Sequence, residues 1–368
     1  MDVAFNSYKI KYLVLDELIG PSLRRNNIKN VNLFINLDWI NFRFRSVQYN
    51  TRFQACGASA FKQYTANVFN LIAHYKKWFS RHGLKVKCYI YFTNAQGGFT
   101  SSLINRQYRE DFLINQSLIN SNCYYVNQTI NGAIPLITKM CDYIDGIYII
   151  NSKGEEPSVV PYLIQSNYPA DWNYMLTKDR LEMQYVNYDK FSIIYPSYNL
   201  GDRVVTAGNL WKTISDKEHK YTDHIEEYDP KLFLPAMAIA GDYVRSIRKI
   251  KAIGWGSILD YLEEIWCTNQ DHSIVTMLDD LRKLLSAKTK ATEEKYLQMH
   301  SRNILIMSMK SRYEVMSEVN KAMMLSQLKD IPDMETINEI SNNPMILGNY
   351  PINVEALFAN TYVNWESR

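Results

Sequence analysis

Short apolar segments rich in β-branched residues alternate with a helical segment in the first half of the chain. Residues 30–37 and 85–92 are apolar enough to be buried strands, and 61–81 between them places apolar side chains at helical spacing. A strand, a helix and a second strand in succession form a β-α-β unit, in which the two strands are parallel. This alternation therefore predicts an α/β fold with a mainly parallel central sheet flanked by helices.

The alternation continues to about residue 200 and then gives way to a helical pattern. Further strand candidates lie at 145–150, 172–177 and 191–195, whereas 229–285 shows helical spacing of apolar side chains. A length of 368 residues favours two or three closely joined domains. We expect an N-terminal extension over 1–29, an α/β domain over 30–210, a helical domain over 211–298, and a C-terminal segment over 299–368 that packs back on the core.

The overall charge is nearly balanced. The 41 lysines and arginines against 38 aspartates and glutamates leave a net charge of +3, so contact with nucleic acid must come from local basic patches. The five cysteines are odd in number and form no C-x-x-C pair, which argues against a zinc ribbon or a disulfide framework and favours a reducing cytoplasm. No apolar run approaches the length of a membrane span, so we expect no membrane partner.

One segment of the helical half combines an acid, basic side chains and a glycine turn. Asp242 lies in Gly-Asp-Tyr-Val-Arg-Ser-Ile, and Ile-Gly-Trp-Gly-Ser follows at 253–257. Glycines let backbone N–H groups approach a phosphate closely, and the N-terminus of the following helix is electropositive. Such contacts follow the backbone of duplex DNA without reading bases. The residues predicted to form this contact are Arg245, Arg248, Lys249, Lys251, Gly254, Trp255, Gly256 and Ser257.

Acidic residues follow the predicted strands, at the edge where sites form in parallel sheets. Asp38 follows the first strand, Glu155 and Glu156 follow the strand near residue 150, and Asp179 follows the strand that ends at residue 177. Hard cations such as Mg²⁺ bind oxygen ligands, and two ions about 4 Å apart can stabilise both oxygens of a phosphodiester displacement. A carboxylate cluster for Mg²⁺ or Mn²⁺ is therefore one hypothesis for this edge.

The motif Leu-Asp-Trp-Ile-Asn-Phe-Arg at 37–43 and the segment 240–257 together resemble the flap endonuclease, or 5′ nuclease, superfamily in its phage branch. The resemblance covers nearly the whole chain from about residue 30. It implies a PIN-like α/β domain, a helix-hairpin-helix-type (H3TH) domain, metal-dependent 5′-3′ exonuclease or flap endonuclease activity, and duplex or branched DNA as ligand. The acids that it implies are Asp38, Glu155, Asp179 and Asp242, with Glu156 as a further metal ligand, and Arg43 joins the DNA contacts.

The chain departs from the family pattern at several acidic positions. Because the affinity of a site for hard cations depends on ligand charge, the missing acids imply at most one bound Mg²⁺ or Mn²⁺ ion. We therefore expect a weak or lost phosphodiesterase activity. The departures are Thr93 after the second strand, Pro157 and Ser158 beside Glu155, Leu181 as the second position of an Asp-x-Asp, and Arg245 in the helical motif.

Three functions remain open from the sequence. The first is a divergent nuclease-fold protein that binds duplex or branched DNA with little or no cleavage. The second is an active metal-dependent 5′-3′ exonuclease or flap endonuclease in DNA replication, and the third is a structural or regulatory subunit of a phage replication, transcription or virion assembly. The missing acids favour the first over the second, and Gly254-x-Gly256 favours it over the third. The cytoplasm of an infected host cell, or a virion or complex, is the implied location.

The acids also have interpretations without chemistry. Asp38 fits the N-cap of a helix, and Glu155 and Glu156 fit first-turn acids that complement a helix dipole. Asp179 fits a surface charge paired with a basic residue on either side of it. Arg248-Lys249-x-Lys251 fits an ordinary solvated face.

Two longer segments have alternatives as well. Residues 99–131 correspond to the region that arches over single-stranded DNA in the family, but their polar composition without a dense basic run favours an ordinary helical surface. The methionine-rich stripe at 299–324 favours a core or a partner interface over a catalytic role. The six histidines show no spacing typical of metal ligands, and we assign them no role.

Overall fold

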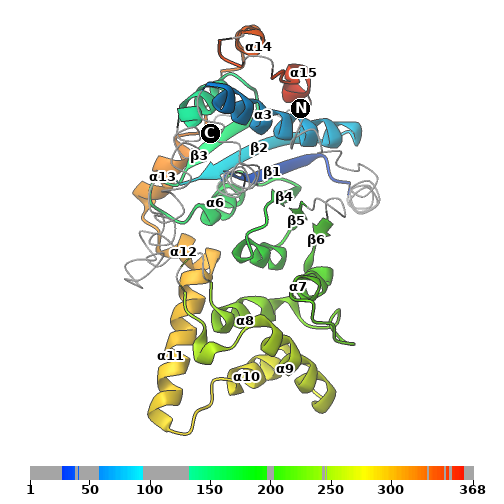
Figure 1. Cartoon of the computed structure of the whole chain (residues 1–368), viewed down its shortest axis with the longest axis vertical. Helices are drawn as coiled ribbons and strands as arrows, with labels where there is room; N and C mark the ends of the chain where they lie inside the picture. Colours follow the sequence, from blue (N-terminus) through cyan, green and yellow to red (C-terminus); the bar gives the residue numbers. More distant parts are fainter. Residues whose placement is uncertain are drawn as a thin grey trace.

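The computed structural model of the chain describes residues 27–37, 40, 58–93, 132–196, 203–242, 245, 247–329, 331–343, 345–347 and 350–359. A six-stranded sheet and its covering helices form one part, and a group of further helices extends from one side of it (Figure 1). Among the described residues, no helix combines the length and the apolarity that crossing a bilayer requires.

The sheet is mostly parallel, which confirms the predicted fold class. The strands run in the order β3-β2-β1-β4-β5-β6, and only β5 and β6 pair antiparallel. The short β6 is an edge strand that the apolar pattern does not predict. The strands are β1 (Asn30–Asn36), β2 (Lys85–Phe92), β3 (Ile147–Asn151), β4 (Trp172–Leu176), β5 (Phe191–Tyr195) and β6 (Arg203–Val205).

The direction of strand addition reverses at β1, which lies between β2 and β4. In register, Ile35 of β1 lies opposite Ile90 of β2 and Leu176 of β4. Ligand sites of open parallel sheets form outside the carboxyl ends of the strands at such a point. The residues that end β1 and follow β4, Asn36 and Thr177, therefore mark the edge where a site is expected.

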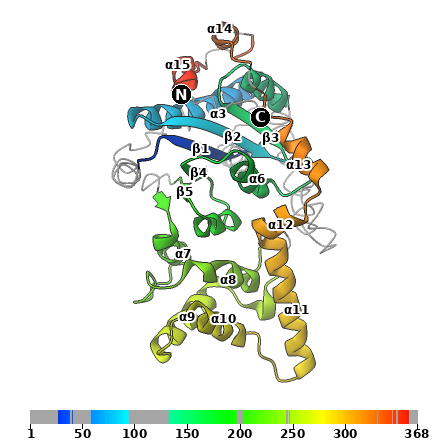
Figure 2. The same cartoon turned by 180° about the vertical axis from the view of Figure 1, so that it is seen from behind.

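One face of the sheet is covered by α3 (Ala58–Arg81), the helix over 132–142 and the end of the chain (Figure 2). The last helices, α14 (Met334–Asn342) and α15 (Val354–Phe358), bury Ile337 and Leu357 in the same apolar cluster as α3. The buried Lys76 Nζ of α3 donates to the backbone carbonyl of Leu357 and to that of Asp145. The end of the chain thus packs back on the α/β domain.

The other face of the sheet shares a continuous apolar core with the helical group. Phe34 of β1 belongs to the same buried cluster as Phe233 and Leu262 of the helical group. The elements on this side are η1 (Pro157–Val159), α6 (Val160–Asn167), η2 (Leu181–Asn187), η3 (Ala207–Asn209), α7 (Leu210–Glu218), η4 (Pro230–Leu232), α8 (Phe233–Ala240), η6 (Ile250–Ala252), α9 (Trp255–Thr268), α10 (Ile274–Lys283), α11 (Lys290–Met307), α12 (Met309–Val315) and α13 (Glu318–Leu325).

The long helix α11 lies along α8 in both views (Figures 1 and 2). Asn303 Nδ2 donates to the Ala238 carbonyl oxygen at 2.8 Å, which fixes the two helices together. The domain boundary expected between residues 298 and 299 falls inside this continuous helix. Met307 and Met309 are fully buried, so this part of the methionine-rich stripe belongs to the core.

Candidate active-site cluster

A buried arginine lies at the centre of the acidic cluster outside the carboxyl edge of the sheet. The Arg245 guanidinium donates through Nη2 to Glu156 Oε1 at 2.9 Å and through Nη1 to Asp242 Oδ2 at 2.7 Å. It also binds Asp179 with both nitrogens, at 2.5 and 3.2 Å. Only 2% of the Arg245 side chain is exposed. Carboxylates from three segments that are distant in sequence therefore converge on one guanidinium, whose planar fork suits such pairing.

A tight turn after α8 places Arg245 beside Asp242. The turn begins at Gly241, whose φ of 73° lies in the region that favours glycine. Asp242 and Ile247 then form an antiparallel bridge, with N–H···O distances of 2.8 Å in both directions. A Cβ atom on Gly241 would lie 2.5 Å from the Ile247 carbonyl oxygen. The glycine is therefore required by its backbone conformation and by the close approach of the returning chain.

Asp179 is held by the loop that follows β4. Its backbone N–H donates to Thr177 Oγ1 at 2.9 Å, and its Oδ1 accepts the Leu181 backbone N–H at 2.9 Å. The next residue, Arg180, pairs with Glu218 at 2.5 Å. The interpretation of Asp179 as a charge paired with a sequence neighbour is therefore wrong, because its partner is Arg245.

Of the two adjacent glutamates, Glu156 enters the cluster and Glu155 does not. The Glu156 side chain is fully buried against Arg245, and it makes no capping hydrogen bond to the 3-10 helix that follows it. Glu155 Oε1 instead accepts a hydrogen bond from Asn320 Nδ2 of α13 at 2.9 Å. The prediction that Glu155 joins the other acids is thus corrected: Glu156 contacts Arg245, and Glu155, which follows the turn that its backbone N–H closes on the Ser152 carbonyl oxygen, contacts α13.

Sequence reasoning missed a fourth acid beside the cluster, Glu182. Its Oε1 accepts hydrogen bonds from Asn36 Nδ2 at 2.9 Å, Tyr91 OH at 2.8 Å and Ser158 Oγ at 2.8 Å. Burial, with a smaller contribution from the Asp179 charge, raises the pKa of Glu182 to about 7, although hydrogen bonds to the carboxylate oppose this rise. The signal in the sequence was an acid one position beyond the missing second acid of the Asp-x-Asp.

The described part of this cluster does not fit a divalent cation. The Arg245 guanidinium lies where Glu156, Asp179 and Asp242 could otherwise converge on an ion, and it satisfies oxygens of all three. Leu181 is fully buried and offers no oxygen ligand. A second positive ion among these groups would be repelled by a guanidinium that water scarcely screens.

Several predicted residues lie outside the described residues. These are the predicted metal ligand Asp38, the predicted DNA contact Arg43 and the segment 99–131. Their roles stay predictions.

The glycine turn predicted to contact phosphate opens α9. Gly254 is the N-cap residue, and a Cβ atom there would meet only the mobile end of Lys249, at 3.5 Å. A Cβ atom on Gly256 would have no neighbour within 4 Å, and Ser257 is exposed in the first helical turn. The N-terminus of α9 is thus open for an anion to approach. Trp255, by contrast, is buried and stacks on Phe233, so it supports the turn from inside.

The basic residues of the motif have three different environments. Arg248 and Lys249 are exposed beside the turn. Lys251 Nζ donates to the carbonyl oxygens of Leu284 at 2.9 Å and Ser286 at 2.7 Å, where α10 ends. Arg245 is buried, so the prediction that it contacts phosphate is wrong: its charge is held by carboxylates. Arg248 and Lys249 are therefore the basic side chains of this motif that are most available to a ligand.

Two consecutive residues of the loop after β4, Asp179 and Arg180, connect the acidic cluster to the glycine turn. Asp179 belongs to the cluster, and the guanidinium carbon of Arg180 lies 5.2 Å from the centre of the Trp255 ring. A cation over an aromatic face is attracted by the ring electrons. The loop after β4 thus fixes the position of the α9 N-terminus relative to the sheet.

Comparison with known proteins places the fold. No protein-family model and no curated protein matches the sequence. The structure is similar to a pseudo-enzyme–product complex of bacteriophage T5 flap endonuclease with DNA and metal ions, with a TM-score of 0.52 and 13% identity over 82% of this chain and 98% of that chain. It is also similar to the T5 5′-exonuclease with bound zinc, with a TM-score of 0.50 and the same identity and coverage. The chain therefore has the flap endonuclease, or 5′ nuclease, fold.

Proposed function

We propose that the protein binds duplex or branched DNA through its phosphate backbone and has weak or no phosphodiesterase activity. The observation that supports this most directly is the pairing of Arg245 with Glu156, Asp179 and Asp242. A protein of the same fold has been crystallised with DNA and metal ions. In this chain a side chain replaces a cation at the centre of the acidic cluster.

The loss of catalysis follows from how the carboxylates are used. Metal-dependent phosphodiester cleavage relies on divalent ions to stabilise the attacking and leaving oxygens. Here Glu156 and Asp242 hold the guanidinium in buried ion pairs, and Asp179 binds both of its terminal nitrogens. Carboxylates engaged in this way are not available to coordinate a second cation or to accept a proton from water.

Binding of DNA relies on a different part of the molecule. The N-terminus of α9 presents backbone N–H groups that carry no hydrogen bond within the helix, and Gly254 and Gly256 in this first turn leave them uncovered. Arg248 and Lys249 are exposed beside it. These groups neutralise and orient phosphates, which provides affinity without base sequence preference. The site therefore suits the backbone of a duplex.

The test is a paired binding and cleavage assay on a labelled 5′-flap duplex, with Mg²⁺, with Mn²⁺ and with EDTA. The native protein is compared with Asp38→Ala and with the double variant Arg248→Glu/Lys249→Glu. The charge-matched control is the double variant Lys77→Glu/Lys139→Glu. Both lysines are exposed, on α3 and on the helix over 132–142, which cover the sheet face away from the helical group (Figure 1). We expect the native protein to bind the duplex without cutting it in the presence of either metal ion. The Arg248→Glu/Lys249→Glu variant should bind the duplex more weakly, and the control should bind it like the native protein.

The salt dependence gives a second readout of the same proposal. The logarithm of the DNA-binding constant falls as the logarithm of the salt concentration rises. Loss of two phosphate contacts should make this slope less steep by about 2, since each contact contributes about 0.9. Metal-dependent cutting that Asp38→Ala abolishes would instead establish a working 5′-3′ exonuclease. Absence of both binding and cutting would indicate that only the fold is retained, as a scaffold.

A further inference from the structure

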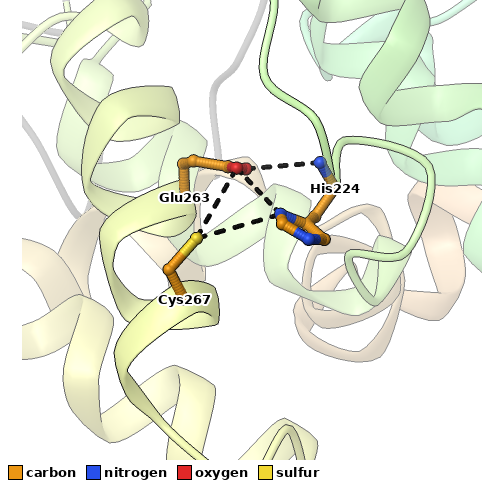
Figure 3. Close-up of side chains that lie close together, drawn as sticks. All are labelled: His224, Glu263 and Cys267. Carbon is orange, nitrogen blue, oxygen red and sulfur yellow. Dashed lines mark hydrogen bonds and ion pairs between the residues drawn. The ribbon is translucent and has the colours of Figure 1, made fainter.

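Three side chains with metal-binding atoms converge on the helical domain, far from the acidic cluster. Glu263 and Cys267 lie one turn apart on α9, and His224 comes from the loop between α7 and η4 (Figure 3). His224 Nδ1 lies 2.8 Å from Glu263 Oε1 and 3.9 Å from Cys267 Sγ. Cys267 Sγ lies 3.8 Å from the same carboxylate oxygen. The three side chains point toward one common position.

We propose that His224, Glu263 and Cys267 form a binding site for Zn²⁺. Bonds of about 2.0 Å to nitrogen or oxygen and about 2.3 Å to sulfur place tetrahedral nitrogen and oxygen ligands about 3.3 Å apart, and sulfur about 3.5 Å from either of them. The two sulfur distances, 3.9 and 3.8 Å, must shorten by about 0.3–0.4 Å. The distance between His224 and Glu263 must grow by about half an ångström, as their hydrogen bond is exchanged for bonds to the ion.

The chemistry of the donors selects the ion. A thiolate and an imidazole are ligands for a borderline cation, whereas Mg²⁺ and Ca²⁺ prefer oxygen alone. Three protein ligands leave the fourth tetrahedral position open for water or another small ligand. Cys267 is exposed, and His224 and Glu263 are partly exposed, so an ion can enter from solvent.

Neighbouring residues already orient two of the proposed ligands, Glu263 and His224. Tyr228 OH donates to the second oxygen, Glu263 Oε2, and the His224 backbone N–H donates to the same atom at 3.4 Å. The Trp266 ring stacks against the His224 imidazole. Partners of this kind hold a ligand in the orientation for binding before the ion arrives. A bound ion would fasten the loop before η4 to α9, the helix that opens with the glycine turn.

The test uses the full-length protein, freed of metal by a chelator and titrated with Co²⁺ and then with Zn²⁺. We expect a near-ultraviolet absorption band of a cobalt–thiolate bond, its loss when Zn²⁺ displaces Co²⁺, one Zn²⁺ per chain by calorimetry, and a higher Tm with Zn²⁺. Cys267→Ser should abolish the band. His224→Ala and Glu263→Gln should each weaken Zn²⁺ binding at least tenfold.

The matched control is His219→Asn. His219 is an exposed histidine close to His224 in sequence but not in the cluster, and asparagine tolerates its φ of 53°. The control should bind Zn²⁺ like the parent. Melting curves of the metal-free variants establish that each is folded, and Glu263→Gln keeps an oxygen acceptor for Tyr228. Zinc binding that survives Cys267→Ser unchanged, or a cobalt complex without the thiolate band, would overturn the proposal and leave a hydrogen-bonded cluster.

Discussion

The Arg245 side chain supplies the positive charge for the acidic cluster, a charge that a bound metal ion would otherwise have to provide. Its terminal nitrogens lie 2.5–3.2 Å from oxygens of Glu156, Asp179 and Asp242. Removing one partner from a buried ion pair leaves an uncompensated charge. The free-energy cost of that charge is far larger than the net stabilisation that the intact pair provides. The stability of this region should therefore depend on residue 245 and not on divalent ions.

Arg245→Ala should lower the free energy of unfolding by about 3–5 kcal/mol, because three carboxylates lose their common partner. Mg²⁺ or Mn²⁺ should then raise the Tm of this variant but not that of the parent, since only the variant has room and charge for an ion. Arg203→Ala is the control: its pair with Asp216 is about one-third exposed, and its loss should cost less than about 1 kcal/mol. Equal effects of the two substitutions in urea unfolding would contradict the role of Arg245.

Glu182 predicts a pH dependence of stability. Its pKa of about 7 lies above the ordinary value of 4.5, so between these pH values the folded state keeps a proton that the unfolded state releases. The stabilisation is complete below 4.5 and is lost as pH rises through 7. The Tm of Glu182→Gln relative to the parent should therefore increase from pH 5 to pH 8. Exposed Glu314→Gln should show no such trend, and a flat difference for Glu182→Gln would refute the raised pKa.

At the scale of elements, the turn from Gly241 to Ile247 joins the helical group to the acidic cluster. It reverses the chain within a few residues, so that Asp242 and Arg245 meet while Ile247 enters the core. The turn depends on a glycine with φ 73° and ψ 175°, a conformation that side chains exclude. This element, and not α8 alone, orients the arginine.

Gly241→Ala should therefore destabilise the protein by at least about 2 kcal/mol, since it adds strain and its Cβ meets backbone atoms at 2.5–2.8 Å. Gly256→Ala is the matched control in the same domain. It lies inside α9 with open space around it, so alanine should stabilise by about 0.5–1 kcal/mol. Chemical denaturation of both variants measures the contrast, and a neutral Gly241→Ala would show that the turn can relax.

At the scale of the whole molecule, the last helices complete the core that the first strands begin. Ile337 and Leu357 are buried in one cluster with residues of β1 and α3. Asn70 Nδ2 on α3 also donates to the Pro351 carbonyl oxygen at 2.9 Å. The fold therefore closes only when the end of the chain returns across the helical group to the sheet.

Leu357→Ala should lower the free energy of unfolding by about 2–5 kcal/mol, because this leucine of α15 is fully buried where α15 packs on α3. Met345→Ala, at a residue that is 87% exposed, is the control from the same C-terminal region and should change stability by less than about 0.5 kcal/mol. Thermal melts of both variants test this. Similar melting temperatures would mean that the end of the chain contributes nothing to the core.

The sequence predicted part of the site and missed the rest for a physical reason. Asp179 and Asp242 were predicted as members of one cluster, because residues after parallel strands meet at one edge and the family motif places Asp242 with them. Both glutamates are buried, and which of them contacts Arg245 depends on the backbone of the segment before η1, which local spacing does not encode. His224 was given no role, because its partners on α9 lie 39 and 43 residues away.

The sequence by itself determined the alternation of strands and helices in the first half of the chain and the mainly parallel sheet, since apolar periodicity and turn residues are local properties of the chain. It also located the glycine turn that opens α9. Only the tertiary structure decided that Arg245 turns inward. A basic side chain near acids in sequence can face solvent, phosphate or carboxylate, and the outcome depends on contacts among residues 156, 179 and 245 that form when distant segments pack.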